Sequence, residues 1–421
     1  MNSRYLSRIC DSELQNALAT TGAVLIEGAK WCGKTSTAAN VACSTLFMQD
    51  PDNTRSYQQM ADTKPSLLLK GETPRLIDEW QMSPVLWDAV RFEVDKRGAP
   101  GQFILTGSAV PADNVTAHTG TGRFARILMR PMSLYESRES NGTVSLADLF
   151  DGKHNIESVS DLSIEQIAFA ACRGGFPATI GKPDISALRM SVDYVEAIIN
   201  QDISRVDGIE KNPNRVRLLL RSLARNIATT ASLQTIFKDV ESAETNISDK
   251  TFTLYHNALR RIFVVETMPA WSPSLRSKTA IRTSPKHHFV DPSIATAVMR
   301  INPAGVLQDF EYFGFLFEAL CARDVRVYAQ HNDGDVFHYR DKSGLEADMI
   351  VALRDGRWGV IEVKLGNKQI EQAAENLLKL KARIDTDKMR QPSFLMILTG
   401  GQYAFRRKDG VFVVPIGCLK N

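Results

Sequence analysis

The sequence contains few cysteines, and none of them forms a C-x-x-C pair. Its 421 residues include six cysteines, which are scattered along the chain. This spacing argues against a zinc site and a disulfide framework, and it fits a reducing compartment. The chain also has no run of 18 or more apolar residues, so we expect no membrane-spanning helix. Its first residues are too polar for a secretory signal, and we therefore expect a cytoplasmic protein.

A large excess of charge of either sign is also missing. The net charge is only +3, so binding of nucleic acid would require a local basic patch. A hydrophobic content of 43% and a charged content of 24% are ordinary for a soluble globular protein. At about 100–200 residues per domain, the length predicts roughly two to four domains.

The first part of the sequence alternates short apolar runs with stretches of helical length. This order predicts βαβ units and a parallel sheet that is buried on both faces, within an α/β domain at residues 1–135. Residues 136–205 look helical, residues 206–300 combine helices with strand-like segments, and residues 301–421 return to a mixed α/β pattern. The four apolar runs are residues 23–27, 45–50, 75–78 and 102–107.

Residues 28–35 read GAKWCGKT and match the phosphate-binding pattern G-x-x-x-x-G-K-[ST]. The apolar run AVLIE precedes them and a helix-compatible segment follows, which is the context of a P-loop. Glycines let the backbone curl around phosphates, and the dipole of the following helix favours the same anion. Lys34 would reach the β- and γ-phosphates, and the Thr35 hydroxyl would bind Mg²⁺. We predict that ATP contacts Gly28, Ala29, Lys30, Trp31, Cys32, Gly33, Lys34, Thr35 and Ser36.

A pair of carboxylates, Asp78 and Glu79, ends the buried run RLID. The carboxyl edge of a parallel sheet faces the ligand crevice. Asp78 is therefore predicted to bind Mg²⁺, and Glu79 to orient and deprotonate the attacking water. The next run ends in Thr106-Gly107-Ser108, where a hydroxyl could contact the γ-phosphate or the water. We choose Thr106 before Ser108 for this catalytic role, and a simple capping hydroxyl is the alternative.

A glycine-rich segment with arginines follows at residues 120–126. Arg123 is predicted to stabilise charge on the transferred phosphoryl group, either in its own chain or in a neighbouring subunit of a homo-oligomer. Arg130 lies close by in the sequence. An ordinary surface arginine is the alternative.

These segments resemble a known family. LIEGAKWCGKT, PRLIDEWQ, FILTGSA and GRFARILMRPMSLYE are similar to the core of AAA-type ATPases of bacteria and archaea. Those proteins end in a domain of unknown function that has a restriction-endonuclease-like core. Further segments extend the resemblance over nearly the whole chain, namely RGGFPA, HHFVDPSIA, GFLFEAL and YRDKSGLEADMIVAL. The resemblance implies an ATPase that uses Mg²⁺ and carries a nuclease-like C-terminal domain.

The middle of the chain is locally basic. Residues 205–288 contain fourteen Lys and Arg against seven Asp and Glu. A helical pattern begins at the N-cap Ser248 and places four apolar residues on one face, and a strand-like stretch follows. This order resembles a winged helix-turn-helix, which predicts DNA contacts through residues 205–290. The alternative is a charged helical surface used for packing or oligomer contacts. The four apolar residues are Phe252, Tyr255, Leu259 and Ile262.

A second acidic set lies in the strand patterns of the C-terminal part. Glu362 and Lys364 are two positions apart and so project from the same strand face, and Asp348 on the preceding strand could join them. Two carboxylates and a lysine suit metal-assisted cleavage of a phosphodiester, and their spacing resembles the PD-(D/E)xK nuclease core. That resemblance implies auxiliary positions for Glu318 and Gln372. An exposed sheet face or an inactive nuclease fold is the alternative.

We therefore expect an ATP-binding protein that hydrolyses ATP with Mg²⁺ and thereby rearranges DNA- or partner-binding domains. The AAA-type domain would be followed by a helical lid at 136–205, a winged-helix-like module at 206–300 and a restriction-endonuclease-like domain at 301–421. Two alternatives stay open, an ATP-regulated Mg²⁺-dependent DNA nuclease and a slow nucleotide-dependent switch that binds a protein partner. The expected partners are ATP, and DNA through residues 205–290 and the C-terminal domain.

Overall fold

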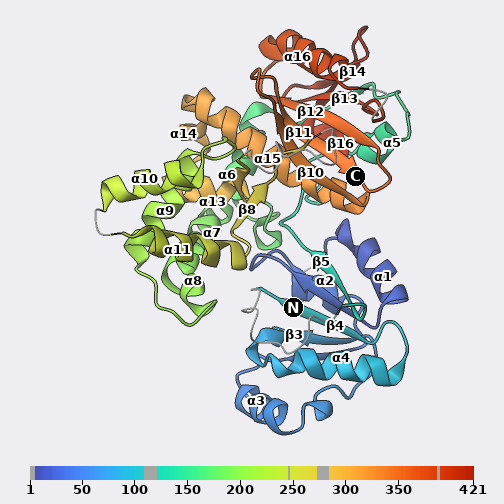
Figure 1. Ribbon diagram of the computed structural model, residues 1–421, viewed down its shortest axis with the longest axis vertical. Coiled ribbons are helices and arrows are strands. Elements are labelled where there is room, and N and C mark those ends of the chain that lie inside the picture. Colours follow the sequence, from blue (N-terminus) through green and yellow to red (C-terminus); the bar gives the residue numbers. More distant parts are fainter. Residues whose placement is uncertain (1–4, 109–120, 245–246, 273–283, 386–388) are drawn as a thin grey trace. The chain divides into compact units, whose positions relative to one another are not determined.

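A computed structural model describes residues 5–108, 121–244, 247–272, 284–385 and 389–421 (Figure 1). The chain forms two compact units. One comprises Met1–Pro131, Gln201–Glu210 and Asn257–Val264, and the other comprises Met132–Asn200, Lys211–His256 and Val265–Asn421. Neither unit is a single continuous segment, because the chain returns to the first unit twice. The division into four domains remains a prediction.

A five-stranded parallel sheet forms the centre of the first unit. Its strands are β1 Ala23–Glu27, β2 Ser44–Phe47, β3 Arg75–Asp78, β4 Phe103–Gly107 and β5 Phe124–Leu128. They lie in the order β2-β3-β4-β1-β5, which confirms the parallel sheet predicted from the apolar runs. The sequence did not predict β5, because this edge strand is mostly half-exposed and lacks a continuous apolar run.

Helices cover both faces of this sheet (Figure 1). They are α1 Cys10–Thr20, α2 Lys34–Ala39, α3 Thr54–Thr63 and α4 Val85–Arg97. The first unit also contains the short helix α8 Ile203–Arg205 and 3₁₀ turns at Pro65–Leu67 and Trp80–Met82. Successive residues of a strand point to opposite faces. Val24 and Ile26 of β1 accordingly pack on the side of α1 and α2, whereas Ala23 and Leu25 pack on the side of α3 and α4. Burial on both faces explains why the strands read as unbroken apolar runs.

A seven-stranded mixed sheet dominates the second unit. In spatial order its strands are β10 Gly334–Arg340, β11 Glu346–Leu353, β12 Trp358–Lys364, β13 Leu395–Thr399, β15 Phe412–Pro415, β14 Tyr403–Arg406 and β7 Ser158–Val159. Two small pairs lie outside this sheet, β6 Val144–Ser145 with β16 Leu419–Lys420 and β8 Val265–Met268 with β9 Lys286–Phe289. The mixed α/β pattern predicted for residues 301–421 is confirmed, and an endonuclease-like core remains a prediction.

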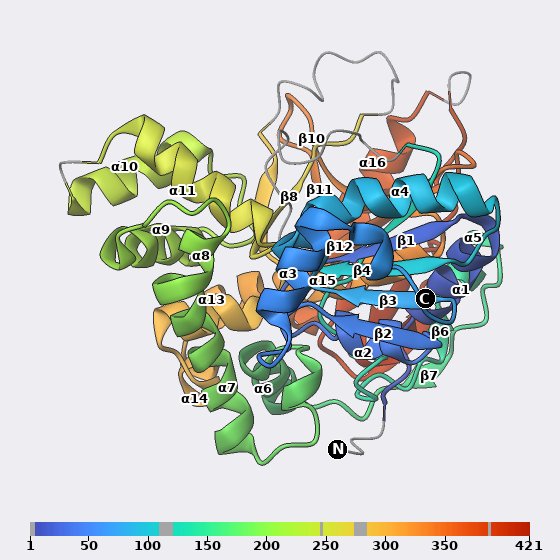
Figure 2. The same cartoon turned by 90° about the horizontal axis from the view of Figure 1, so that it is seen from below.

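Two long helices pack on this sheet, and most of the other helices form a separate group (Figure 1). α15 Phe310–His331 contacts β10, β11 and β12, and α16 Ile370–Ala382 packs on β11, β12 and β13. In the helical group, α13 Pro292–Met299 packs against α6 Ile164–Arg173 and α7 Asp184–Ala197 (Figure 2). The other helical elements are α5 Leu146–Phe150, α9 Pro213–Arg225, α10 Leu233–Ala243, α11 Asp249–Arg261, α14 Pro303–Gln308, the π-helix Ile198–Asp202, and 3₁₀ turns at Pro177–Thr179, Asn367–Gln369 and Ile416–Cys418.

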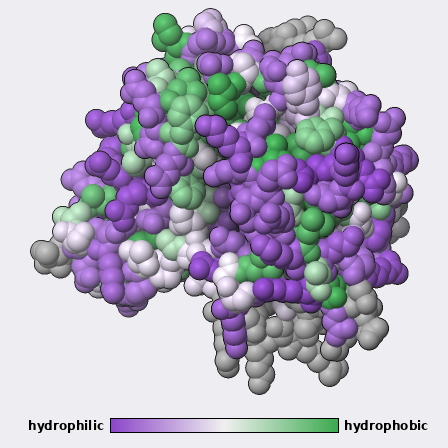
Figure 3. Space-filling view, turned by 90° about the horizontal axis from the view of Figure 1, so that it is seen from above, coloured by the Kyte–Doolittle hydropathy of each residue, from purple (hydrophilic) through white to green (hydrophobic). Residues whose placement is uncertain are grey.

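Hydrophilic residues predominate on the face shown in Figure 3, and hydrophobic residues form small groups among them. The 22-residue helix α15 has the length of a membrane span, but it contains charged residues such as Glu318 and Arg323. Among the described residues, no helix is both long and apolar enough to cross a membrane. A cytoplasmic location remains a prediction.

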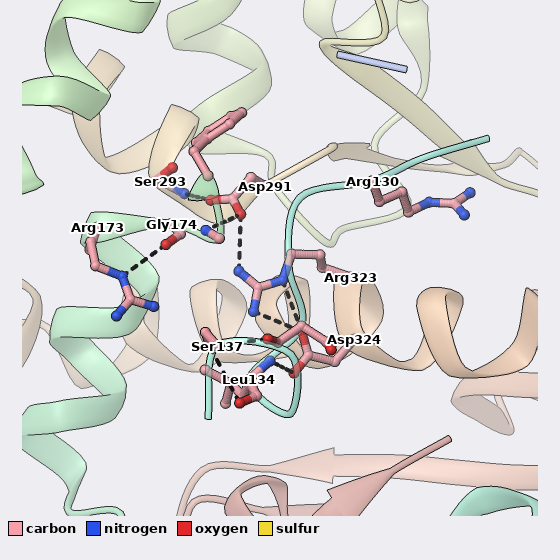
Figure 4. A network of polar contacts seen from close by, with 12 residues as sticks. Arg130, Leu134, Ser137, Arg173, Gly174, Asp291, Ser293, Arg323 and Asp324 are labelled. Atoms are coloured by element: carbon pink, nitrogen blue, oxygen red, sulfur yellow. Dashed lines mark hydrogen bonds and ion pairs between the residues drawn. The ribbon is translucent and has the colours of Figure 1, made fainter. Parts of the chain in front are cut away.

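A buried charge network joins distant segments of the second unit (Figure 4). Arg323 donates to the carboxylates of Asp291 and Asp324, with nitrogen–oxygen distances of 2.9 and 2.8 Å. Asp291 also accepts from the backbone N–H of Gly175, and Asp324 accepts from that of Leu134. All three charged side chains are almost completely buried. The segments RGGFPA and HHFVDPSIA supply two of these partners, so they serve the packing of this unit.

Replacement of Arg323 with Met is expected to lower the free energy of unfolding by about 3–5 kcal/mol, because two buried carboxylates would lose their counter-charge. Urea unfolding followed by circular dichroism measures this loss. Arg357→Met is the matched control, since the ion pairs of Arg357 with Asp151 and Asp355 are largely exposed. Such pairs contribute only about 0–1 kcal/mol. Equal losses in the two variants would show that the network is not a stabilising element.

Candidate functional site

The P-loop follows β1 directly and needs glycine at two positions. Gly28 has a φ of +151°, and a Cβ atom placed on it would lie 2.1 Å from the backbone oxygen of Met129. Gly33 has a φ of +104° and ends the loop at the start of α2. Both conformations are unfavourable for residues with a side chain. The two glycines of the sequence pattern therefore coincide with the two positions where the backbone requires them.

Lys34 is folded back over the loop. Its ammonium donates to the backbone oxygens of Gly28 and Ala29, at 2.9 and 2.8 Å, and the residue is only 5% exposed. An ammonium held above the concave side of the loop is placed to donate to phosphate oxygens at the same point. The geometry fits the role that the sequence predicts for Lys34.

Asp78 is the centre of a buried polar cluster at the carboxyl edge of the sheet. Its Oδ1 atom accepts from the hydroxyls of Thr35, at 2.7 Å, and Thr106, at 2.6 Å. Its Oδ2 atom accepts from the side-chain amide of Gln49, at 3.0 Å. The strand register explains the cluster, because Asp78 of β3 pairs with Thr106 of β4 and with Phe47 of β2. The structure thus brings together Thr35, Asp78 and Thr106, three of the residues selected from the sequence.

The sequence analysis missed Gln49 and gave Thr106 a different part. Gln49 follows the end of β2, next to β3, and polarity at a carboxyl strand edge was the signal that could have identified it. Thr106 donates to Asp78, so it positions that carboxylate in this structure. A carboxylate and a hydroxyl are donors that suit Mg²⁺, and Thr35 with Asp78 therefore fits a magnesium site.

Glu79 lies next to this cluster in an uncommon backbone conformation. Its φ is +56°, in the left-handed region that residues other than glycine rarely adopt. Its carboxylate accepts from the side-chain amide of Gln81 and, at 3.3 Å, from the hydroxyl of Ser108. Unlike Asp78, Glu79 is only half-buried. Strained residues of this kind concentrate at functional sites, which supports a catalytic role for Glu79.

Arg8 supports the P-loop, although the sequence analysis considered its segment only as a possible secretory signal. Its guanidinium donates to the backbone oxygen of Cys32 and to that of Arg130, each at 2.7 Å. The residue is 6% exposed. Arg8 therefore ties the P-loop to the segment that follows β5, and nothing in its local sequence pattern distinguishes it from a surface arginine.

The remaining predicted P-loop residues have different environments. Ala29 and Cys32 are buried. The Lys30 ammonium pairs with the carboxylate of Asp202 at 2.6 Å, within the first unit. Trp31 is 47% exposed, and Ser36 is exposed on α2. Contacts of these residues with ATP remain predictions.

The position of Arg123 does not fit a role at the nucleotide site of its own chain. Arg123 immediately precedes β5, and the first residue of β5 pairs with Ala23, the first residue of β1. The P-loop follows the opposite end of β1, and a five-residue strand spans roughly 15 Å. The Arg123 guanidinium instead pairs with Asp95 of α4 at 2.9 Å. A role in a neighbouring subunit remains a prediction, as does the homo-oligomer that it requires.

The predicted nuclease-like residues also converge, together with a lysine that the sequence analysis did not include. Lys364 contacts Glu362 at 2.8 Å and Asp348 at 3.8 Å. Lys286 contacts Glu318 at 2.6 Å and Asp348 at 3.7 Å. Gln372 does not join this cluster, contrary to the sequence expectation. It is exposed on α16 and donates to Asn376.

Burial shapes the electrostatics of this acidic cluster, which comprises Glu318, Asp348, Glu362 and the two lysines. Burial and the neighbouring Asp348 raise the pKa of Glu318 and of Glu362 above the usual glutamate range, against the opposing effect of the two lysines. For Lys286, burial alone would lower the pKa, but Glu318 and Asp348 outweigh it and raise that pKa above the usual lysine value. These two carboxylates therefore favour the protonated form of Lys286. Within the described ranges, no group of three or more His, Cys, Asp or Glu side chains is arranged to hold a metal ion.

Known proteins resemble this chain over most of its length, at low identity. The uncharacterized proteins Mb2031c of Mycobacterium bovis and Rv2008c of Mycobacterium tuberculosis are each 22% identical over 414 residues, covering 96% of this chain and 82% of the relative. Among solved structures, the Walker-type ATPase PABY2304 of Pyrococcus abyssi is 14% identical with a TM-score of 0.43, and the match covers 71% of this chain and 97% of that one.

Three family models match successive parts of the chain. Residues 164–305 match a domain of unknown function (DUF8612), and residues 313–419 match another domain of unknown function (DUF4143). Residues 20–137 match an AAA domain, and this range contains the P-loop, Asp78 and Glu79. The family match, and not the low structural overlap, defines the domain. The match supports a P-loop ATPase domain of the AAA type at residues 20–137, and with it the binding and hydrolysis of ATP.

Proposed function

We propose that this chain hydrolyses ATP with Mg²⁺ and uses the reaction to rearrange its helical and C-terminal parts. The observation that carries the proposal is the cluster in which Thr35 of the P-loop and Thr106 of β4 both bond to Asp78, with Glu79 beside it. This arrangement combines a phosphate-binding loop, a magnesium-binding pair and a base at one edge of one sheet. An AAA domain match over the same residues agrees with it.

Each residue has a distinct part in the proposed reaction. Lys34 neutralises charge on the β- and γ-phosphates, and Thr35 and Asp78 hold Mg²⁺, which supplies further neutralisation of the phosphates. Gln49 and Thr106 orient Asp78 through their hydrogen bonds. Glu79 accepts the proton of the attacking water, and Gln81 and Ser108 hold its carboxylate in place.

Lys30 offers a route from the nucleotide to the rest of the chain. It lies in the P-loop and pairs with Asp202. Asp202 belongs to a short segment of the first unit, Gln201–Glu210, which continues on both sides into the second unit. A phosphate at the loop attracts Lys30 and so competes with Asp202 for its charge. Loss of that ion pair would release Asp202 from the P-loop, in a segment whose chain continues into the second unit on both sides.

An assay of phosphate release tests the proposed function. Purified protein is expected to release phosphate from ATP in the presence of Mg²⁺, and chelation with EDTA is expected to stop the release. The assay is repeated with added DNA, because stimulation would connect turnover to the basic region. Tight ATP binding without measurable release would favour the slow nucleotide-dependent switch.

The proposed DNA contacts rest on the basic region of residues 205–290. The predicted helix is present as α11, and Ser248 accepts from the backbone N–H of Thr251, as an N-cap does. Its four predicted apolar residues are buried. Several basic side chains are engaged in ion pairs, including those of Arg215, Arg225 and Lys286. The exposed cations Lys250 and Arg260 of α11 are the stronger candidates for phosphate contacts.

Replacing both Lys250 and Arg260 with Ala is expected to weaken DNA binding and to flatten its dependence on salt. With fewer phosphate contacts, binding releases fewer counterions from the DNA. Fluorescence anisotropy with a labelled duplex at several salt concentrations measures both effects. The control variant replaces Lys153 and Arg189, two exposed cations outside the basic region. If both double variants behave like the unmodified protein, α11 serves packing and does not contact DNA.

A further inference from the structure

The acidic cluster of the second unit contains two cationic side chains, those of Lys286 and Lys364. Glu318 comes from α15, Asp348 from β11, and Glu362 and Lys364 from β12, so the sheet and one covering helix form its walls. Lys286 reaches the same point from β9, which belongs to the separate two-stranded pair β8–β9. Its ammonium lies between the carboxylates of Glu318 and Asp348, at 2.6 and 3.7 Å.

A divalent cation does not fit this arrangement as it stands. Such an ion needs carboxylate oxygens within roughly 2.0–2.6 Å, free of competing cations. In the acidic cluster both carboxylate oxygens of Asp348 already face a cation. Oδ1 faces Lys286, while Oδ2 accepts from the backbone N–H of Val363 at 2.8 Å and faces Lys364. Lys286 is only 8% exposed, so its ammonium is enclosed by the surrounding side chains.

We propose that Lys286 is a built-in counter-cation that takes the place of a divalent metal ion in the acidic cluster. The second unit then neither binds such an ion there nor cleaves DNA. This inference concerns the second unit alone, and it goes beyond the proposed ATPase function. The nuclease alternative would then apply only to a form of the protein from which Lys286 has been removed or displaced.

The surroundings of Lys286 hold it in this place. The strand β9 pairs with β8, and Lys286 is opposite Met268. Residues just after β8 bond to β10, because the backbone N–H of Trp271 donates to the oxygen of His338 and that of His338 donates to Pro269. Glu266 of β8 also pairs with Arg326 of α15 at 2.7 Å. The β8–β9 pair is thus attached to β10 by backbone hydrogen bonds and to α15 by an ion pair.

Glu362 gives an independent sign that the acidic cluster could hold another cation in place of Lys286. The residue is 5% exposed, and its Oε1 atom accepts from Lys364. Its Oε2 atom is buried and has no hydrogen-bond partner among the described residues. A buried carboxylate oxygen without a partner is costly, and it is available as a ligand once the charge of Lys286 is gone. Removal of the Lys286 charge should therefore turn the acidic cluster into a metal site.

Titration with Mn²⁺ in the absence of nucleotide, followed by electron paramagnetic resonance of the free ion, tests the proposal. The unmodified protein is expected to bind no more Mn²⁺ than the Asp348→Asn variant. Lys286→Met, which keeps the length of the side chain and removes its charge, is expected to bind an additional ion per chain. That additional ion should disappear in the Lys286→Met/Asp348→Asn double variant, and it should raise the melting temperature of Lys286→Met by mass action.

A second variant keeps the test decisive if Lys286→Met does not fold. Lys286→Met/Glu318→Gln removes one charge of each sign and leaves Asp348 and Glu362 as ligands. It is expected to gain the Mn²⁺ ion that adding Asp348→Asn abolishes. The proposal is overturned if the unmodified protein already binds an ion that Asp348→Asn removes. It is also overturned if the folded variants without Lys286 bind no more Mn²⁺ than the unmodified protein.

Discussion

The Glu79→Gln variant is expected to bind ATP with nearly unchanged affinity but to release phosphate about 10²-fold more slowly, or slower still, as is typical when a general base is lost. Glutamine has the size and shape of glutamate, so it can still contact Gln81 and Ser108. It cannot accept a proton from water, and only the chemical step should suffer. Binding is measured by calorimetry with ATP, and turnover by phosphate release under the same conditions.

The neighbouring acid provides the comparison for this experiment. Asp78→Asn should also slow turnover, but through weaker binding of Mg²⁺, so that raising the Mg²⁺ concentration recovers part of the rate. Glu79→Gln should show no such recovery. If Asp78→Asn keeps the full rate while Glu79→Gln loses it, the site is correct but the assignment of the metal ligand is wrong. Full turnover by Glu79→Gln would remove Glu79 from the mechanism.

The Lys34→Ala variant is expected to lose most of its affinity for ATP. Lys34 supplies the ammonium held over the loop by the backbone oxygens of Gly28 and Ala29, and this lysine is the one that reaches the β- and γ-phosphates in the sequence pattern. Calorimetric titration with ATP measures the loss. Circular dichroism should show an unchanged fold, because the hydrogen bonds that disappear lie within a single loop.

Lys70→Ala is the matched control, since Lys70 is an exposed lysine in the same unit. It should bind ATP like the unmodified protein. The P-loop assignment fails if Lys34→Ala binds ATP equally well. A parallel loss in both variants would point to a general effect of charge on the unit and away from a specific contact with phosphate.

Much of the first unit could be predicted because its information is local in the sequence. The strands β1, β3 and β4 are buried on both faces, so they appear as unbroken apolar runs. The P-loop pattern follows one of these runs directly, and Asp78 and Glu79 lie at the end of another. Carboxyl ends of neighbouring parallel strands meet at one edge of a sheet. The location of the strands therefore predicted that Asp78 and Thr106 lie at the edge of the sheet that carries the P-loop.

Contacts between segments far apart in the sequence were decided only by the tertiary structure. Arg8 and Gln49 join the nucleotide site through backbone and side-chain bonds that no local pattern marks. Arg123 occupies the wrong end of β5, because that edge strand lacks the apolar run that would have shown where it begins. In the second unit, the spacing predicted that Glu362 and Lys364 share one strand face and that Asp348 of the neighbouring strand could join them, and Lys364 contacts both carboxylates in the structure.

Lys286 shows most clearly what the sequence alone left undecided. It lies 32 positions before Glu318 in the sequence, in a stretch that was read as a DNA-binding surface, yet its ammonium is 2.6 Å from that carboxylate. Residue types and their spacing determined which side chains could share a strand face, because the period of a strand is fixed by backbone geometry. The partner that neutralises them was determined by the position of β9, whose Lys286 contacts Glu318 of α15 and Asp348 of β11, since Coulomb attraction depends on distance in space and not on separation along the chain.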